Sequence, residues 1–338
     1  AEALTAWHVQ CPTGNSHFMS LMGNETAKPA SRVRQVSVSA EEAGQRIDNF
    51  LSRHLKGVPR SHIYRILRRG EVRVNRGRIR PHYKVQAGDT VRIPPLRLEP
   101  VRERVLSPER LPAIAGHILF ENDRLLVLNK PAGIAVHGGS GLSYGVIEAL
   151  RALHPEAPYL ELVHRLDRET SGCLMIARRR SALRDLHSQL REGRVIKHYL
   201  ALVRGALEST RRVDAPLRKN QLQGGERIVR VQADGKPAAT VFRPLSCHGD
   251  ATLVEAVLET GRTHQIRVHA AHIGHPLAGD DKYGDAEFNR MMKAHGLRRM
   301  FLHAHMLEFT DPASGEPVNV SAPLADELKG VLDSLEAA

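Results

Sequence analysis

Apolar positions first fall into a regular pattern over residues 46–55. Ile47, Phe50, Leu51 and Leu55 recur at intervals of three and four, with polar residues between them. This period is typical of an amphipathic helix that buries one stripe of side chains. The pattern therefore predicts a helix here.

A second helix and two strands follow directly. The same period predicts a helix over residues 62–69, with Ser61 as its N-cap. Residues 71–75 alternate between apolar and polar, as do residues 90–93, which predicts two strands. We expect a turn at Arg76-Gly77, so that the second strand pairs back onto the first.

Basic side chains are concentrated in this part of the chain. Residues 45–104 hold 16 Lys and Arg against 5 Asp and Glu, whereas the rest holds 33 against 32. A solvated charged face is one explanation, but so local an excess favours a polyanionic partner, contacted mainly through its phosphates. The residues that we expect on this face are Arg46, Arg60, Ser61, Arg65, Arg68, Arg69, Arg73, Arg76, Arg78, Arg80 and Lys84.

Two short helices and a small sheet with a basic face resemble the S4 RNA-binding domain. The resemblance rests on the segments RIDNFL, VRVN and GDTVRI. It implies an S4 domain over residues 36–96. Residues 1–35 show no sustained period, which predicts a disordered extension, and residues 97–112 are rich in proline and charge, which predicts a linker.

The remainder, residues 113–330, is predicted to form a larger second domain. Leu125 to Leu128 is a short apolar run that predicts a buried strand ending at Lys130-Pro131. A helical period predicts a helix over residues 182–192 with Ser181 as its N-cap. Further strands are predicted at residues 197–205, 240–242 and 252–258.

The segment HRLDRETSG, residues 164–172, places Asp167 between Arg165 and Arg168. Neighbouring positive charge favours the ionised carboxylate. Gly172 interrupts regular structure just before an apolar run, so we expect Asp167 at the mouth of a strand. By spacing alone, a surface turn with ordinary salt bridges is the favoured interpretation.

HRLDRETSG closely resembles the catalytic-aspartate motif of the RluA-type pseudouridine synthases, enzymes that isomerise uridine in RNA. ENDRLLVLNKPAGIAVH, KHYLALVRG and TGRTHQIRVH resemble further motifs of that family. The resemblance implies an α+β fold, in which a small S4 domain precedes a mixed, mainly antiparallel sheet with flanking helices.

The resemblance also implies roles for residues of the motifs. Asp167 would be the catalytic carboxylate, Arg267 its ion-pair partner, and Tyr199 a group beside the base that removes the C5 proton. A base inside folded RNA must leave its stack, and Arg165 would fill the vacancy. Residues expected to line the substrate are His164, Leu166 and Ile266.

Three features of this domain keep a second interpretation. A tyrosine in a strand, such as Tyr199, is usually there for packing. Lys130 is better explained as a structural ion-pair partner than as a catalytic group. The cluster of His264, His269, His272 and His275 invites a zinc interpretation, but the sequence has no HExxH and no nearby thiolate or carboxylate set, so we expect no metal.

Composition narrows the class of protein further. The three cysteines are widely spaced, which suits a reducing cytoplasm, and no apolar stretch is long enough for a membrane span. No P-loop and no GxGxxG in a strand–turn–helix setting is present, and isomerisation needs no redox or phosphate chemistry, so we expect no cofactor.

Taken with the resemblance, these features predict a cytoplasmic, monomeric enzyme that isomerises uridines in bacterial 23S ribosomal RNA. Two other hypotheses stay open: a sister synthase with another RNA target, and a non-catalytic rRNA-binding assembly factor that uses the S4 face alone.

Overall fold

The computed structural model describes residues 33–55, 58, 60–96, 117–138, 145–221 and 227–337. Nearly all of the predicted extension and the whole predicted linker lie outside these residues. The described residues divide into two compact units, one within residues 33–38 and 44–96 and the other within residues 39–43 and 117–337. Each unit is described separately.

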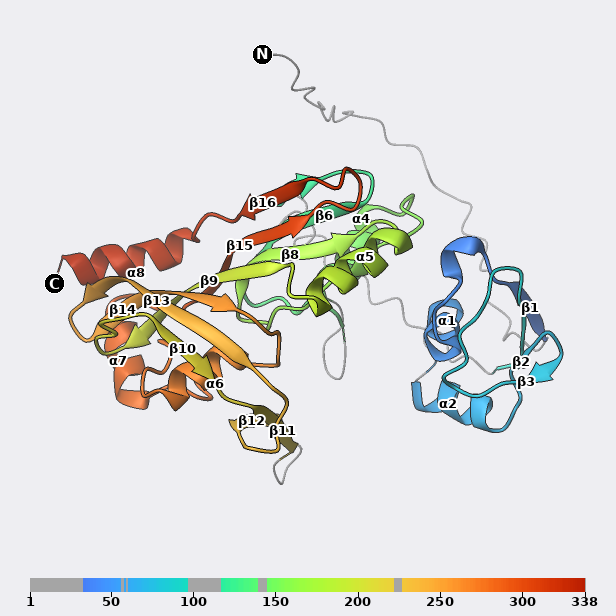
Figure 1. Ribbon diagram of the computed structural model, residues 1–338, viewed down its shortest axis with the longest axis horizontal. Coiled ribbons are helices and arrows are strands. Elements are labelled where there is room, and N and C mark those ends of the chain that lie inside the picture. The colour runs from blue at the N-terminus through green and yellow to red at the C-terminus, as the bar shows by residue number, and fades with distance from the viewer. Residues whose placement is uncertain are drawn as a thin grey trace, which may run out of the picture. The chain divides into compact units, whose positions relative to one another are not determined.

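The smaller unit contains a four-stranded antiparallel sheet and two α-helices (Figure 1). The strand order is β1-β4-β2-β3. The elements in chain order are β1 (Arg34–Ser37), α1 (Ile47–His54), α2 (Arg60–Arg68), β2 (Arg73–Val74), β3 (Gly77–Arg78) and β4 (Thr90–Ile93). The 3-10 helix η1 (Ala40–Glu42), which lies between β1 and α1 in the sequence, belongs to the larger unit.

The predicted core of this unit is confirmed. Ile47, Phe50, Leu51 and Leu55 are all buried in one cluster. Strand β4 pairs antiparallel with β2, as predicted.

Two local predictions are wrong. Helix α2 begins at Arg60, so Ser61 lies in its first turn and is not the N-cap. The turn between β2 and β3 falls on Asn75 and Arg76, both with positive φ, and Gly77 already belongs to β3. Asn75 adopts this conformation because its side chain donates to Asp89 and accepts from the Thr90 amide, tying the turn to β4.

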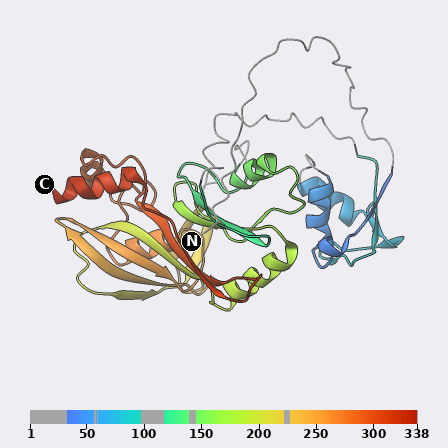
Figure 2. The ribbon, with the colours of Figure 1, turned by 90° about the horizontal axis from the view of Figure 1, so that it is seen from above.

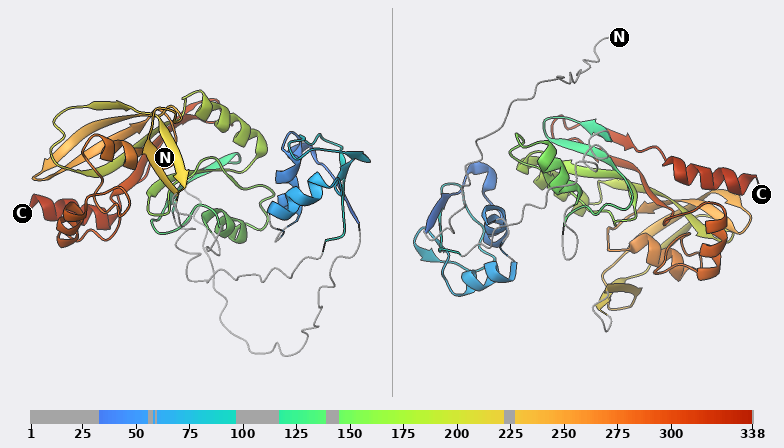
Figure 3. Two further views of the ribbon diagram at one scale, coloured as in Figure 1. Left: turned by 90° about the horizontal axis from the view of Figure 1, so that it is seen from below. Right: turned by 180° about the vertical axis from the view of Figure 1, so that it is seen from behind.

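The larger unit is built on a ten-stranded sheet with helices beside it (Figures 1 and 2). Its strands are β5 (Ile118–Glu121), β6 (Leu125–Lys130), β7 (Glu161–Leu162), β8 (Ser171–Ala177), β9 (Ile196–Arg204), β10 (Arg211–Asp214), β13 (Ala239–His248), β14 (Ala251–Leu258), β15 (Leu302–Thr310) and β16 (Pro317–Ser321). A separate pair, β11 (Leu217–Gln221) and β12 (Arg227–Val231), forms a small hairpin that projects from the body of the unit (Figure 3).

The main sheet has the order β10-β13-β14-β9-β15-β8-β6-β5, with β16 on β15 and β7 on β8. Every pairing is antiparallel except β15 with β8, which run parallel at His303–Ser171 and Ala304–Gly172. The loop that holds Asp167 enters β8 at this junction, so the parallel contact fixes where that loop ends. A mixed, mainly antiparallel sheet confirms the expected fold class.

Both faces of the sheet are buried at its centre. On β6 and β8, Leu126 and Leu174 belong to one cluster and Val127 and Cys173 to another. Residues of opposite parity along a strand point to opposite faces, so these strands are covered on both sides. This explains why the sequence shows continuous apolar runs here and not an alternation.

Helices cover different parts of the sheet. Figure 1 shows α4 (Val146–Leu153) and α5 (Arg180–Arg191) beside β6 and β8. The remaining helices, α6 (Gln265–His272), α7 (Ala286–Ala294) and α8 (Asp326–Glu336), lie towards β13 and β14. Helix α5 begins at Arg180 after the N-cap Arg179, so the prediction that Ser181 caps it is wrong. No helix among the described residues has the length and apolar content to cross a membrane.

Candidate active site

Asp167 lies in the loop between β7 and β8, where the amide of Thr170 donates to the Asp167 carbonyl and closes a turn. The loop leads into β8, whose second residue, Gly172, has a φ of +105°. Glycine adopts this backbone conformation readily, whereas residues with a side chain rarely do. A Cβ at Gly172 would lie 2.2 Å from the carbonyl oxygen of Ala304 on β15. Glycine is therefore required here because the neighbouring parallel strand packs directly against this backbone.

Lys130 stabilises the turn that contains Asp167 through hydrogen bonds to backbone carbonyls. Its ammonium, fully buried, donates to the carbonyls of Pro131 and Ile134 at 2.8 Å and of Arg168 at 3.1 Å. Burial lowers the pKa of Lys130 to about 7. The expectation that Lys130 is an ion-pair partner is wrong, because its ammonium donates its hydrogen bonds to three backbone carbonyls. Lys130 thus joins the end of β6 to the residue that follows Asp167.

Arg267 connects Asp167 to a second, hidden carboxylate. Its guanidinium makes two hydrogen bonds of 2.7 Å to Asp280, and its Nη1 lies 3.5 Å from Oδ2 of Asp167. The Asp280 side chain is fully buried, whereas that of Asp167 is 22% exposed. Arg267 was expected to pair with Asp167, and the structure brings the two together, but its stronger partner is Asp280.

Electrostatics keep the buried pair of Arg267 and Asp280 charged. Burial opposes ionisation of Asp280, but the hydrogen bonds and charge of Arg267 outweigh it and lower the pKa of Asp280. Burial likewise opposes the charge of Arg267, and Asp280 and Asp167 together raise its pKa. The buried pair leaves the guanidinium fixed and still able to face Asp167.

His264 approaches Asp167 from the other side. Its Nε2 is 3.7 Å from Oδ2 of Asp167, and its Nδ1 is 2.9 Å from the hydroxyl of Tyr283. That hydroxyl also accepts a hydrogen bond from the amide N–H of Val229, which holds the ring of Tyr283 beside His264. Burial lowers the pKa of His264 against the opposing effect of Asp167, which favours the neutral ring.

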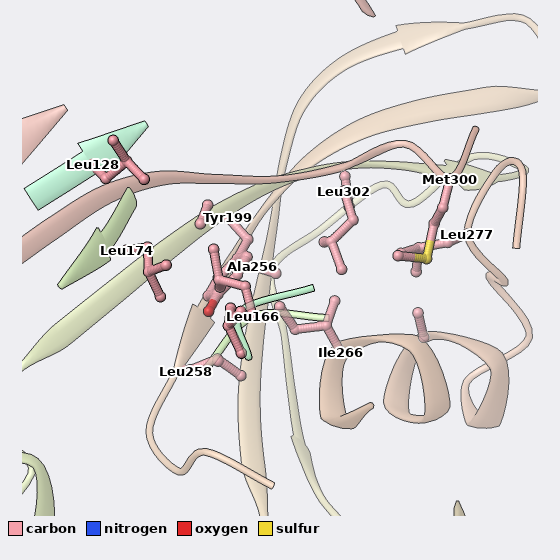
Figure 4. Packing of buried hydrophobic residues seen from close by; sticks show 14 of the residues in the cluster. Leu128, Leu166, Leu174, Tyr199, Ala256, Leu258, Ile266, Leu277, Met300 and Leu302 are labelled. Carbon is pink, nitrogen blue, oxygen red and sulfur yellow. The ribbon is translucent and has the colours of Figure 1, made fainter. Parts of the chain in front are cut away.

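Tyr199 lies on β9, and its ring is almost completely buried. Burial, followed by the charge of Asp167, raises the pKa of Tyr199, so it is a neutral phenol. Figure 4 shows it with Leu166, Leu258 and Ile266, which belong to the same buried cluster. Tyr199 therefore packs in the core and also lines a cavity next to Asp167, while its role in chemistry stays a prediction.

Asp167, Tyr199, His264 and Arg267 line one cavity of about 700 Å³. The predicted site residues that line it are His164, Arg165, Leu166, Asp167, Tyr199, Ile266 and Arg267. Among them, Arg165 is exposed to solvent. His164 accepts the Met175 amide, and burial lowers its pKa to about 3, so it is a neutral supporting group.

Sequence reasoning missed Asp280, His264 and Tyr283 as parts of this site. Asp280 and Tyr283 lie in PLAGDDKYG, a family-like stretch interpreted as structural only. Its signal was a pair of acids directly after an apolar run, which fits a buried carboxylate that needs a cation. The sequence gives no sign of which arginine that cation is.

Two other histidines of the predicted cluster, His269 and His275, have structural partners. His269 is buried, with Nδ1 2.9 Å from Thr240 Oγ1 and Nε2 2.9 Å from the Ala215 carbonyl. No group of three or more His, Cys, Asp or Glu suited to a metal ion occurs in the part of the chain that the structure describes.

The smaller unit carries the expected basic face. The side chains exposed there are Arg46, Arg65, Arg68, Arg69, Arg76, Arg78, Arg80 and Lys84, with Arg73 half-buried. The side chains of Arg60 and Ser61 lie outside the described residues. Arg46 is held by Asp48 at 2.8 Å and by Tyr64, so it also stabilises the fold of this unit.

Comparison with known families agrees with both units. A model of RNA pseudouridylate synthases matches residues 124–272, and an S4 domain model matches residues 45–91. The chain is 58% identical over 311 residues to ribosomal large subunit pseudouridine synthase C of Escherichia coli K12, covering 90% of this chain and 98% of that protein. It is 57% identical over 306 residues to the protein of that name from Pasteurella multocida, covering 90% and 94%.

Solved structures give the same result. Human RNA pseudouridylate synthase domain containing 4 superposes with a TM-score of 0.56 at 27% identity, covering 67% of this chain and 95% of that one. Human RNA pseudouridylate synthase domain containing 1 gives 0.52 at 28% identity, covering 66% and 95%. From its motifs, its fold and these relatives, the chain belongs to the RNA pseudouridylate synthase family, as an enzyme of the RluA type with an N-terminal S4 domain.

Proposed function

We propose that this protein isomerises uridines to pseudouridine in large-subunit ribosomal RNA, with Asp167 as the catalytic carboxylate. One observation carries the proposal: Asp167 is a partly exposed carboxylate inside a cavity, next to an arginine that a buried acid holds in place. The choice of ribosomal RNA is supported by the names of the bacterial relatives and by the basic S4 domain.

The reaction breaks the bond between C1′ and N1 of uridine and forms a bond between C1′ and C5. C5 loses a proton and N1 gains one, so atoms and electrons balance without a cofactor. Asp167 would attack or stabilise the junction of sugar and base, and Arg267, whose Nη1 lies 3.5 Å away, would hold it in the correct orientation.

Tyr199 would contact the base and take the proton from C5. Because burial and Asp167 keep Tyr199 protonated, this transfer must be coupled to loss of its own hydroxyl proton. Ile266 and Leu166 would pack on the base from the cavity wall.

RNA has to deliver a single base into this cavity. Arg165 would fill the gap left in the stack, and the basic residues of the S4 domain would hold the RNA backbone. We further propose that the protein acts in the cytoplasm, outside the membrane and as a monomer.

The proposal is tested by sequencing pseudouridines of 23S rRNA from cells with and without the gene. The proposed function predicts that a defined set of sites is lost in the deletion strain and restored by the wild-type gene. Loss of sites in another RNA would indicate a sister synthase. An unchanged pseudouridine map with a ribosome assembly defect would contradict the enzyme and favour the assembly factor.

A further inference from the structure

Lys197 is a cationic side chain in the cavity wall that takes no part in the mechanism proposed above. It lies on β9 two residues before Tyr199, so both side chains leave the strand on the same face. Lys197 lines the cavity and is half-buried. Its ammonium makes no hydrogen bond or ion pair with any residue that the structure describes.

The acids of the cavity do not neutralise it. Three carboxylates line the cavity, and each is already engaged by an arginine. Asp167 faces Arg267, Glu192 is bonded by Arg194, and Glu259 accepts two hydrogen bonds of 2.9 and 2.8 Å from Arg212.

An unpaired ammonium in a desolvated wall costs free energy. Burial lowers the pKa of Lys197, and no negative neighbour opposes this effect. His164, the titratable ring that interacts with it, is neutral and supplies no negative charge. A ligand that brought partial negative charge to Nζ would recover this cost.

The local backbone leaves room for the ammonium. A Cβ at Gly261, in the loop after β14, would lie 3.2 Å from Nζ of Lys197. Glycine thus lets Nζ lie close against that loop. The backbone positions of Lys197 and Tyr199 are roughly 6.6 Å apart along β9.

We propose that Lys197 binds a carbonyl oxygen of the target uracil and stabilises the negative charge that develops on it. This inference rests on the proposed function. When C1′–N1 breaks, the electron pair goes to the uracil ring and is shared by its carbonyl oxygens. The charge disappears when C5 bonds to C1′, C5 loses its proton and N1 is protonated. Preorganised cations facing such developing charge lower the barrier more than they strengthen binding.

A base contact is favoured over a backbone phosphate by the distribution of charge around the cavity. Arg165, Arg191 and Arg262 are exposed at its rim, where the RNA backbone must remain. Lys197 lies deeper, beside buried Tyr199 and paired in register with Leu258. The extruded base reaches this depth.

The test is Lys197→Met, which keeps the shape of the stem and removes the charge. Single-turnover formation of pseudouridine is measured with enzyme in excess over 23S rRNA from the deletion strain, alongside the dissociation constant for that RNA. We expect the rate to fall about tenfold or more, with affinity changed by less than about twofold. Lys293→Met, an exposed lysine of α7, is the matched control and should match the wild type.

A second variant keeps the test informative if Lys197→Met loses activity through a folding defect. Lys197→Ala opens space for a small amine, so added methylamine or ethylamine should restore part of the rate. An unchanged rate in Lys197→Met, or weaker binding with a reduced salt dependence at an unchanged rate, would overturn the inference, and the second result would assign Lys197 to a phosphate. An inactive wild type would overturn the proposed function as well, so the two failures are distinguishable.

Discussion

Asp280 holds the guanidinium of Arg267 through two hydrogen bonds of 2.7 Å, and the same guanidinium reaches Asp167 at 3.5 Å. The buried acid thereby fixes the distance between a cation and the proposed catalytic carboxylate. The ion pair between Arg267 and Asp280 thus orients the guanidinium towards Asp167.

Asp280→Asn should weaken both stability and turnover. Removing one partner of a buried ion pair leaves Arg267 uncompensated, which we expect to cost about 3 kcal/mol in the free energy of unfolding by urea. The freed guanidinium would turn towards Asp167, and pseudouridine formation should fall at least tenfold. Asp281→Asn, an exposed neighbour, is the control and should change neither quantity.

The same pair predicts a dependence of stability on pH. Because the folded-state pKa of Asp280 is lowered, its contribution is complete above the unfolded pKa of about 3.9 and is lost as pH falls through the folded pKa. The difference in unfolding free energy between wild type and Asp280→Asn should therefore shrink between about pH 5 and pH 3. A difference that stays constant over this window would show that the carboxylate charge does not stabilise the fold.

Lys130→Met should loosen the turn after Asp167. It removes three hydrogen bonds to carbonyls while keeping the bulk of the stem. We expect a stability loss of about 1–3 kcal/mol and a larger relative loss of turnover than of RNA affinity. Lys329→Met, at an exposed lysine of α8, is the control. An effect of Lys130→Met confined to RNA affinity would contradict the proposal that Lys130 supports the turn after Asp167.

Charge removal on the S4 face should weaken RNA binding across sequences. Replacing Arg68, Arg69 and Arg73 by Gln removes exposed or half-exposed guanidinium groups. The slope of log affinity against log salt should become shallower by up to about 0.9 for each RNA phosphate that the variant no longer neutralises. The measurement is filter binding at several salt concentrations.

The control for this prediction removes equal charge from the larger unit. Arg290, Lys293 and Arg298 are exposed, and their replacement by Gln should leave the salt slope close to that of the wild type. Equal slopes for the two triple variants would contradict RNA binding by the S4 face.

Periodic elements could be predicted from the sequence because burial sets their pattern. The stripe from Ile47 to Leu55 and the apolar run of β8 are examples, and both are buried. Helix starts were less predictable. Ser61 and Ser181 are good N-cap residues, but the backbone enters each helix one or two residues earlier.

The motifs predicted the residues at the centre of the candidate site, but not the residues that hold them in place. Asp167, Tyr199 and Arg267 do line one cavity. The bond between Arg267 and Asp280 and the carbonyl cage of Lys130 depend on which loops meet in space. Local spacing carries no such information for charged residues, because many partners are possible for each.

The most direct test of the account is Asp167→Asn, assayed in cells that lack the wild-type gene. Pseudouridines in 23S rRNA are mapped after expression of wild type or variant, with unfolding free energy and RNA affinity measured on the purified proteins. The account predicts no pseudouridine at the dependent sites, with folding and RNA binding retained. Restoration of those sites by Asp167→Asn would contradict it.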